Sequence, residues 1–375
     1  MSFARFMEMA LYDVPYGFYM TQAVESEQLS YDRIGWGGDF FTAPELSPIL
    51  AKTLVRQILD IDVRLGHPDP FTFMEIGAGN GTFAVDFIKE CRASASDFFN
   101  RLSYQIVERS PYLQLRQASR LREAVGNRAE GHLRWWPSLE EIDSNSLTGV
   151  VFSNELVDAL PVHRVRWENN QLREIFVAYG GGHFVECLDH CSSPKLAEYV
   201  DTYHVSLSEG QTSELHLEAE AWMKNVARIL HRGVVMTIDY GHTGSDYYRS
   251  DRKDGTLLCY YRHAISTNPY TRVGEQDMTA HVNFSALAGS GTASGLDLIG
   301  FTTLANWLIG LGVEELVRDQ DQESEDVKAL AHLLRPHGMG KTFKVLVQRK
   351  GMESFTIQGL RYPAFFDDVV SSHTD

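Results

Sequence analysis

A glycine-rich turn that follows an acidic residue is the clearest chemical feature of the sequence. Glu75, Gly77, Gly79 and Gly81 occupy every second position of EIGAGNG, directly after the apolar run FTFM. Glycine lets a backbone turn tightly and approach a ligand closely. A helix that follows offers free N–H groups at its start. A carboxylate beside such a ligand suits an amine or a sulfonium cation.

The spacing of the glycines separates this turn from the one that binds dinucleotides. A dinucleotide-binding fold uses GxGxxG and holds a pyrophosphate at the start of the helix. Here the spacing is GxGxG, and Thr82 stands in the place of the third glycine. Glu108 ends the next apolar run, YQIV, and a carboxylate at that place can accept the hydroxyl protons of a ribose.

Together these features predict a binding site for S-adenosylmethionine. Glu108 is predicted to bind the ribose. The predicted contacts from the turn are Glu75, Gly77, Ala78, Gly79 and Gly81. The alternative interpretation is a purely structural glycine turn beside an exposed glutamate.

A second acidic motif follows a later apolar run. SNELVDALP comes after GVVF, at the carboxyl end of a predicted strand, where ligands bind in open α/β sheets. If Glu155 and Asp158 lie on one helical turn, their spacing of three places them on the same face. Two carboxylates there suit a planar, charged guanidinium. We therefore predict catalytic roles for Glu155 and Asp158, and cofactor contact for Asn154. Local capping by Glu155 and structural packing of Asp158 are the alternatives.

An aromatic segment near the N-terminus is a further candidate. GDFFTAPELSP includes Phe41 and Thr42, and aromatic side chains there can cover an adenosine and exclude water. We predict cofactor contacts for Phe41 and Thr42. An ordinary packing segment is the alternative interpretation.

One histidine completes the predicted site. Residues 277–287 read as a helix, on which Asp277 and His281 would pair across one turn. We predict that His281 accepts a proton or belongs to a lid, with a structural histidine as the alternative.

Alternating apolar strands and helical segments must position these residues. Strands are expected at 71–77, 104–108, 132–136, 149–155, 233–241, 296–301 and 341–350. Helices are expected at 51–59, 80–92, 111–123, 213–230, 303–311 and 324–334, with Gly233 as the C-cap of the fourth. This alternation predicts an α/β fold with a doubly wound, mostly parallel, Rossmann-like mixed sheet covered on both faces.

The pattern changes after residue 161. PVHRVRWENNQLREIFVAY alternates apolar and polar residues around Asn169 and Asn170, which predicts a β-hairpin. The predicted organisation is an N-terminal cap (1–50), the first half of the cofactor-binding core (51–161), a β-rich insertion (162–212), the second half of the core (213–350) and a tail (351–375).

Composition limits the class of partner. The 375 residues carry a formal net charge of −16, which repels nucleic acid and would attract a basic protein segment; solubility alone is the alternative interpretation of this charge. The sequence contains no run of about 18 apolar residues, so no membrane span is predicted. His183, Cys187, His190 and Cys191 match no common metal-site spacing, so no metal site is predicted.

Several separate motifs resemble one protein family. In order along the chain they are GDFFTAPELSP, EIGAGNGTF, YQIVERSP, VFSNELVDALPVHRV, IDYG and QDMTAHVNF. Together they resemble the MidA family, also called DUF185, which includes the mitochondrial complex I assembly methyltransferase. The resemblance implies a class I methyltransferase fold and S-adenosylmethionine as cofactor. For the mitochondrial members it implies methylation of an arginine in a complex I subunit.

The resulting functional hypothesis is methyl transfer to a protein arginine side chain, in an arginine-containing segment. The alternatives are a small-molecule or other protein N- or O-methyltransferase, a cofactor-binding assembly factor with weak catalysis, and an NAD-dependent oxidoreductase, against which Thr82 argues. The segment FARFMEMALY begins at residue 3 without an Arg-rich leader. A bacterial cytoplasmic location is therefore expected, or the mitochondrial matrix for a eukaryotic protein.

Overall fold

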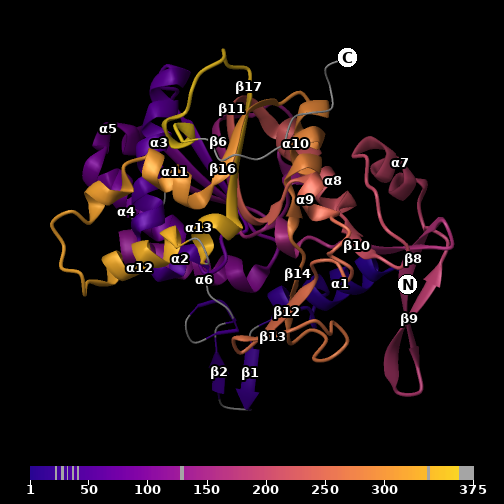
Figure 1. Cartoon of the computed structure of the whole chain (residues 1–375). Coiled ribbons are helices and arrows are strands. Elements are labelled where there is room, and N and C mark those ends of the chain that lie inside the picture. The colour runs from indigo at the N-terminus through magenta and orange to yellow at the C-terminus, as the bar shows by residue number, and fades with distance from the viewer. Residues whose placement is uncertain are drawn as a thin grey trace.

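An eight-stranded sheet lies at the centre of the computed structural model (Figure 1). The structure describes residues 1–21, 23–26, 29–31, 33–35, 38–39, 42–126, 131–335 and 338–362. The strand order of the sheet is β16-β17-β11-β6-β3-β4-β5, and β15 pairs with β11. The strands are β3 (Phe71–Ile76), β4 (Leu102–Val107), β5 (Leu133–Trp136), β6 (Leu147–Asn154), β11 (Leu230–His242), β15 (Val282–Asn283), β16 (Asp297–Thr303) and β17 (Phe343–Lys350).

The direction of the strands creates a place for a ligand. Five strands run parallel to one another: β11, β6, β3, β4 and β5. Strand β17 lies between β11 and β16 and runs antiparallel to both. From β3 the chain moves outward to β4 and β5, and then returns to β6 on the other side of β3. Such a reversal opens a crevice at the carboxyl ends of the strands.

Helices cover both faces of this sheet (Figure 1). One face buries a cluster in which Phe73, Phe83 and Phe152 meet apolar residues of α3, α4, α6, α11 and α12. The opposite face packs against α8 and α10. The bounds of the helices are α3 (Ile49–Leu65), α4 (Thr82–Ser94), α5 (Ser96–Arg101), α6 (Pro111–Val125), α8 (Leu217–Ile229), α10 (Phe284–Ala293), α11 (Leu304–Gly310), α12 (Glu325–Leu334) and α13 (Met339–Thr342). The doubly wound mixed α/β prediction is confirmed.

A smaller sheet has the order β10-β7-β8-β9. Its strands are β7 (His163–Glu168), β8 (Gln171–Gly180), β9 (His183–Asp189) and β10 (Thr212–Leu215). Asn169 and Asn170 both have positive φ, at 54° and 58°, as a tight hairpin turn requires. The predicted hairpin is therefore confirmed. The β8–β9 end of this sheet extends away from the body of the molecule (Figure 1).

The N-terminal helix α1 (Phe3–Tyr12) packs against the smaller sheet. Phe3, Phe6 and Met7 are buried in a cluster with Val177 and Met278. The N-terminal amine of the chain also donates to the Val177 carbonyl at 2.9 Å. This end of the chain is thus anchored, and α1 forms a fixed wall.

The remaining elements are short. They are η1 (Phe18–Met20), β1 (Ala23–Ser26), β2 (Leu29–Tyr31), α2 (Ala43–Leu46), η3 (Leu139–Glu141), η4 (Val157–Ala159), α7 (Pro194–Thr202), α9 (Gly244–Tyr247), β12 (Leu258–Tyr261), β13 (Ala264–Ser266), β14 (Asp277–Thr279), η5 (Val313–Leu316) and η6 (Gln358–Leu360). Within the described ranges, no helix is long and apolar enough to cross a membrane.

Three local predictions are wrong. Residues 277–287 do not form one helix, because β14 and β15 precede α10, which begins at Phe284. Gly233 does not cap a helix: α8 ends at Ile229, and Gly233 lies within β11. Residues 213–215, expected at the start of a helix, belong to β10, where Ser213 pairs with Val165. In each case strand pairing across the fold overrides the local pattern.

Candidate active site

The glycine turn joins β3 to α4 at the point where the strand order reverses. Gly77, Gly79 and Gly81 have φ of 72°, 51° and 78°, in the left-handed region that favours glycine. A Cβ atom on Gly77 would lie 2.6 Å from the Leu156 side chain, and one on Gly79 would lie 3.3 Å from Ile34. The backbone conformation and the close neighbours both explain why glycine occupies these positions.

A cavity of about 420 Å³ lies over this turn. Its walls come from the glycine turn, the segments that follow β4, β5 and β6, helices α1 and α8, and the α2 segment. Seven glutamates line it: Glu8, Glu45, Glu75, Glu108, Glu140, Glu155 and Glu218. Among the described residues that line the cavity, Arg109 is the only basic side chain of the Lys or Arg type. The cavity therefore favours a cationic ligand.

Glu75 lies at the floor of the cavity, where β3 ends. It is 4% exposed, and the Tyr104 hydroxyl donates to its Oε2 atom at 2.5 Å. Burial raises the pKa of Glu75 to about 7, with a further rise from Glu108, while the Tyr104 hydrogen bond lowers it. A bound cation would favour its ionised form.

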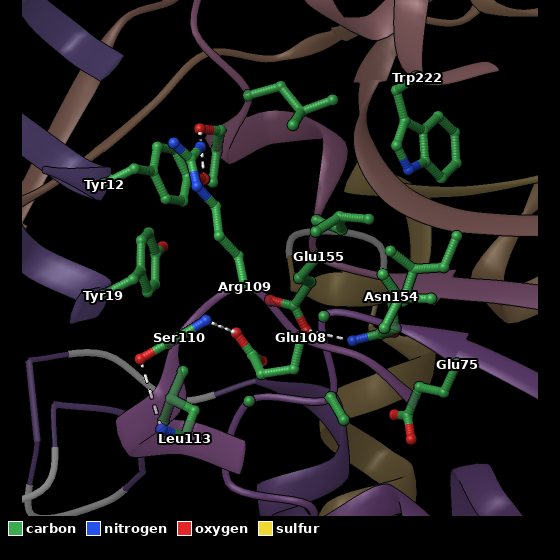
Figure 2. A pocket seen from close by; sticks show the side chains of 18 of the residues that line it. Tyr12, Tyr19, Glu75, Glu108, Arg109, Ser110, Leu113, Asn154, Glu155 and Trp222 are labelled. Atoms are coloured by element: carbon green, nitrogen blue, oxygen red, sulfur yellow. Dashed lines mark hydrogen bonds between the residues drawn. The ribbon is translucent and has the colours of Figure 1, made fainter. Parts of the chain in front are cut away.

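Glu108 follows β4 directly and is held from two sides. The Ser110 N–H donates to Oε1 at 2.9 Å (Figure 2). The Gln117 side-chain amide donates to Oε2 at 3.1 Å. Burial raises its pKa to about 7, against these hydrogen bonds. The carboxylate is thereby fixed in orientation at the edge of the cavity.

Gln117 is a residue that sequence reasoning missed. Its amide nitrogen also donates to the Gly79 carbonyl at 2.9 Å, and its oxygen accepts from Trp135 Nε1 at 3.1 Å. This one side chain links the glycine turn to Glu108. Its only sequence signal is a polar residue on the apolar stripe of α6, where it is fully buried.

Glu155 follows β6 directly and also lines the cavity (Figure 2). It has a φ of 51°, a strained value for a residue with a side chain. The Ala43 N–H and the Asn154 amide both donate to Oε1 at 3.0 Å. Burial raises the pKa of Glu155 to about 8. Asn154 also lines the cavity, and its Oδ1 atom has no hydrogen-bond partner among the described residues.

Asp158 does not share a helical face with Glu155. The 3-10 helix η4 begins at Val157, after Glu155, and Asp158 is outside the cavity lining. Its side chain instead bonds with the Tyr240 hydroxyl, and burial raises its pKa to about 6. Asp239, on β11, accepts from the N–H groups of Leu156, Val157 and Asp158 at 2.9–3.2 Å and so holds this loop in place.

His281 also lies outside the cavity lining. Its Nδ1 atom is 2.9 Å from His242 Nε2, and burial lowers its pKa to about 4. Asp277 lies on β14 and accepts from the Tyr19 hydroxyl at 2.8 Å. The predicted pairing of Asp277 with His281 on a helix is wrong, because the two residues belong to separate contacts.

The N-terminal segment closes one side of the cavity. Tyr12 and Tyr19 stack with ring centroids 5.5 Å apart, and the Tyr12 hydroxyl donates to the Ala159 carbonyl at 2.9 Å. Thr42 lines the cavity beside Glu45, whose carboxylate accepts from the Thr82 hydroxyl. Phe41 lies outside the described residues.

Trp222, on α8, is a second residue that sequence reasoning missed. It is 8% exposed, and its indole nitrogen has no hydrogen-bond partner among the described residues. Trp222 lines the cavity (Figure 2), as do Leu139 and Leu160. Its position on the buried stripe of α8 resembles that of any core residue, so the sequence carries no signal for this role.

Comparison with known proteins identifies the family. Residues 53–302 match a family described as an S-adenosyl-L-methionine-dependent methyltransferase. The chain belongs to this family. The prediction of a MidA-like methyltransferase with a class I fold and S-adenosylmethionine as cofactor is confirmed.

Similar chains include solved structures and curated relatives. A COG1565 superfamily member from Burkholderia thailandensis bound to S-adenosyl-homocysteine is 30% identical, with a TM-score of 0.86 over 97% of this chain and 91% of that one. The mitochondrial protein arginine methyltransferase NDUFAF7 homolog of Drosophila melanogaster is 27% identical over 72% of this chain and 65% of its own length. The Xenopus tropicalis NDUFAF7 protein is 25% identical over 87% of this chain and 79% of its own length.

The residues of this chain fit the methyltransferase cofactor. The glycine turn lines the cavity, and its backbone there carries no side chain at Gly77 or Gly79. Trp222 and Asn154 line the cavity, and the Trp222 N–H and the Asn154 Oδ1 atom are buried without a hydrogen-bond partner among the described residues. The carboxylates match a ligand that carries a sulfonium and an amine. Among the described residues, no group of three or more His, Cys, Asp or Glu is suited to hold a metal ion.

Proposed function

We propose that this methyltransferase acts on an arginine side chain of a protein. The observation that carries the proposal is the charge of the cavity, which seven glutamates line together with a single arginine among the described residues. A guanidinium keeps its positive charge at neutral pH, and carboxylates are its natural partners. The names of the curated relatives, which are protein arginine methyltransferases, support the same class of acceptor.

The cofactor is proposed to lie along the carboxyl edge of β6, β3 and β4. Asn154 and the turn residues Glu75, Gly77, Ala78, Gly79 and Gly81 would hold its methionine part, and Thr42 would cover it. Glu108 would bind the ribose hydroxyls. Trp222 and Leu139 would enclose the adenine, with the indole N–H as a donor to a ring nitrogen. The Phe41 contact remains a prediction.

Glu155 is the proposed catalytic residue. Of the three residues considered for this role, Glu155 lines the cavity, whereas Asp158 and His281 do not. When bound, S-adenosylmethionine supplies an electrophilic methyl group. Glu155 would orient the acceptor guanidinium and take the proton that its nitrogen loses on methylation, so that the methylated guanidinium keeps one positive charge. Burial raises the pKa of Glu155 to about 8 in the free protein. The charge of a bound guanidinium would favour the ionised carboxylate, which can then accept the proton that the acceptor loses.

Radiolabelled methyl transfer tests the acceptor class. The protein is incubated with labelled S-adenosylmethionine and a lysate of cells that lack its gene, and the labelled product is mapped by mass spectrometry. We expect methylarginine in a protein. Label in a small molecule or in another side chain would overturn the arginine assignment and leave the methyltransferase assignment intact.

Glu155→Gln tests the catalytic residue on the acceptor so identified. The substitution keeps the oxygen that accepts from Ala43 but removes the charge. We expect turnover to fall by about 100-fold or more, in the range of general-base effects, with affinity for S-adenosyl-homocysteine nearly unchanged. Glu123→Gln, on the exposed face of α6, makes the same charge change outside the cavity and serves as the control. Parental turnover in Glu155→Gln would exclude the residue from catalysis.

A further inference from the structure

The cavity wall already binds one guanidinium, that of Arg109. Its Nη2 atom lies 2.5 Å from the Glu8 carboxylate, and its Cζ atom lies 4.9 Å from the centre of the Tyr12 ring. All three residues line the cavity. A carboxylate beside an aromatic face is a favourable environment for an arginine side chain, because it combines an ion pair with a cation–π contact.

Helix α1, which carries Glu8 and Tyr12, is held in place by contacts with the rest of the fold. Glu8 and Tyr12 lie on α1, which is anchored by its buried apolar face. Tyr12 is also fixed by its hydrogen bond to the Ala159 carbonyl and by its stacking on Tyr19. The Tyr19 hydroxyl in turn donates to Asp277. The Tyr12 ring and the helix that carries Glu8 are therefore held by contacts that do not involve Arg109.

Arg109 itself is held loosely. It belongs to the loop between β4 and α6, and its side chain is 54% exposed, while that of Glu8 is 25% exposed. An ion pair with this exposure contributes about 0–1 kcal/mol. In Figure 2 the side chain extends from beside Glu108 toward Tyr12. A competing cation can therefore displace it at small cost.

We propose that Glu8 and Tyr12 form a guanidinium subsite for the acceptor segment, which Arg109 covers in the free protein and leaves when that segment enters. Arg109 is then an internal competitor that weakens the binding of cationic segments. The site takes an arginine of the acceptor protein, either the residue to be methylated on its way to Glu155 or a neighbouring one. This inference rests on the proposed function for the class of acceptor.

Binding without turnover tests the subsite. The probe is a fluorescein-labelled Gly-Arg-Gly-Arg-Gly peptide, titrated by fluorescence anisotropy against the protein saturated with S-adenosyl-homocysteine. In Arg109→Met we expect binding to tighten by about twofold to fivefold, since releasing a contact worth up to about 1 kcal/mol corresponds to that range. A Gly-Lys-Gly-Lys-Gly peptide is expected to gain less, because an ammonium lacks the planar face that stacks on Tyr12.

Two further variants separate the subsite from a general change of charge. Arg134→Met removes another arginine that lies on an aromatic ring, 3.6 Å from the centre of Trp136, but outside the cavity lining. It is expected to leave peptide affinity unchanged. Adding Glu8→Gln to Arg109→Met is expected to cancel the gain, because the subsite then lacks its carboxylate.

The peptide titration can fail while the methylation assay succeeds, and the reverse. Unchanged, weaker or unmeasurable peptide binding in Arg109→Met overturns the subsite, as does a gain that survives Glu8→Gln or appears equally in Arg134→Met. A gain specific to Arg109→Met supports the subsite even if the methylated atom belongs to another side chain. Methylarginine in the product without that gain would leave the proposed function standing and reject the subsite alone.

Discussion

At the scale of single residues, the carboxylates around the cavity are fixed by hydrogen bonds from other elements of the fold. Glu108 is held by Gln117, and Glu155 by the backbone of Ala43. Trp222 keeps a buried donor without a partner among the described residues. Buried polar groups are normally satisfied, and we propose that the orphaned donor in the cavity wall contacts the cofactor.

Glu108→Ala is expected to weaken binding of S-adenosyl-homocysteine by about 30-fold to 1000-fold, which corresponds to the loss of two charge-assisted hydrogen bonds. Isothermal titration calorimetry measures the change. The control is Glu123→Ala, on the same helix as Gln117 but facing solvent. If Glu108→Ala binds within a few-fold of the parent, another residue must hold the ribose.

Trp222→Phe is expected to weaken cofactor binding by about fivefold, the equivalent of one hydrogen bond of roughly 1 kcal/mol, without loss of folding stability. No protein hydrogen bond is broken, because the indole nitrogen has no partner among the described residues. In the control Trp136→Phe, the N–H that donates to Gln105 at 2.7 Å is removed outside the cavity. The control should lose thermal stability and keep affinity. The reverse pattern would argue against an adenine contact at Trp222.

At the scale of elements, the turn between β3 and α4 imposes two separate demands on glycine. Gly77 needs a positive φ, and its missing Cβ leaves room for Leu156, which lines the cavity. Gly66, which caps α3, has a φ of 79°, but a Cβ atom at this position would meet no neighbour within 4 Å. Substitution of Gly66 therefore introduces backbone strain alone, whereas substitution of Gly77 introduces backbone strain and a steric clash.

Gly66→Ala is expected to cost about 1 kcal/mol of folding free energy, the penalty for a left-handed alanine, and to leave cofactor affinity unchanged. Gly77→Ala should carry the same penalty and also lower affinity by about tenfold or more, equivalent to at least about 1.4 kcal/mol, because Leu156 must move toward the ligand. Chemical denaturation and calorimetry report the two quantities. Equal affinity in both variants would show that the turn tolerates a side chain.

At the scale of the whole molecule, the buried carboxyl groups tie folding and binding to pH. Burial raises the pKa of Glu75, Glu108 and Asp277 to about 7 and that of Glu155 to about 8. Well below pH 4 these groups are protonated in both the folded and the unfolded chain, so they do not affect the pH dependence of stability there. Between their unfolded pKa values and pH 8, the unfolded chain releases protons that the folded chain retains. The contribution of these groups to stability therefore falls as pH rises through this window.

We expect the melting temperature of the ligand-free protein to fall between pH 5 and pH 8. Over the same range, the affinity for S-adenosylmethionine should rise relative to that for S-adenosyl-homocysteine, because only the former carries a sulfonium charge that favours ionised carboxylates. Differential scanning fluorimetry and calorimetry at several pH values measure both trends. A ratio of affinities that stays constant with pH would contradict this coupling. Glu155→Gln should flatten both slopes.

The local sequence determined the glycine turn, the acidic residue after β4 and the order of the core strands along the chain. Each depends on short-range physics: apolar runs bury as strands, and glycine adopts a positive φ that other residues avoid. The same reasoning failed at residues 277–287, where strand pairing replaced the expected helix, and at Asp158, which contacts Tyr240 on β11. Contacts between distant strands carry no periodic signal in either segment.

Only the tertiary structure decided which polar residues share the cavity. Glu155 and Asp158 are three residues apart, yet the positive φ of Glu155 and the anchoring of the loop by Asp239 leave only Glu155 in the lining. Glu8, Arg109 and Trp222 come from α1, the β4–α6 loop and α8, and they meet because the sheet brings these elements to one edge. Sequence patterns encode the type of each element through local periodicity. The contents of the cavity depend on how those elements cross in space, and that is set by packing over the whole fold.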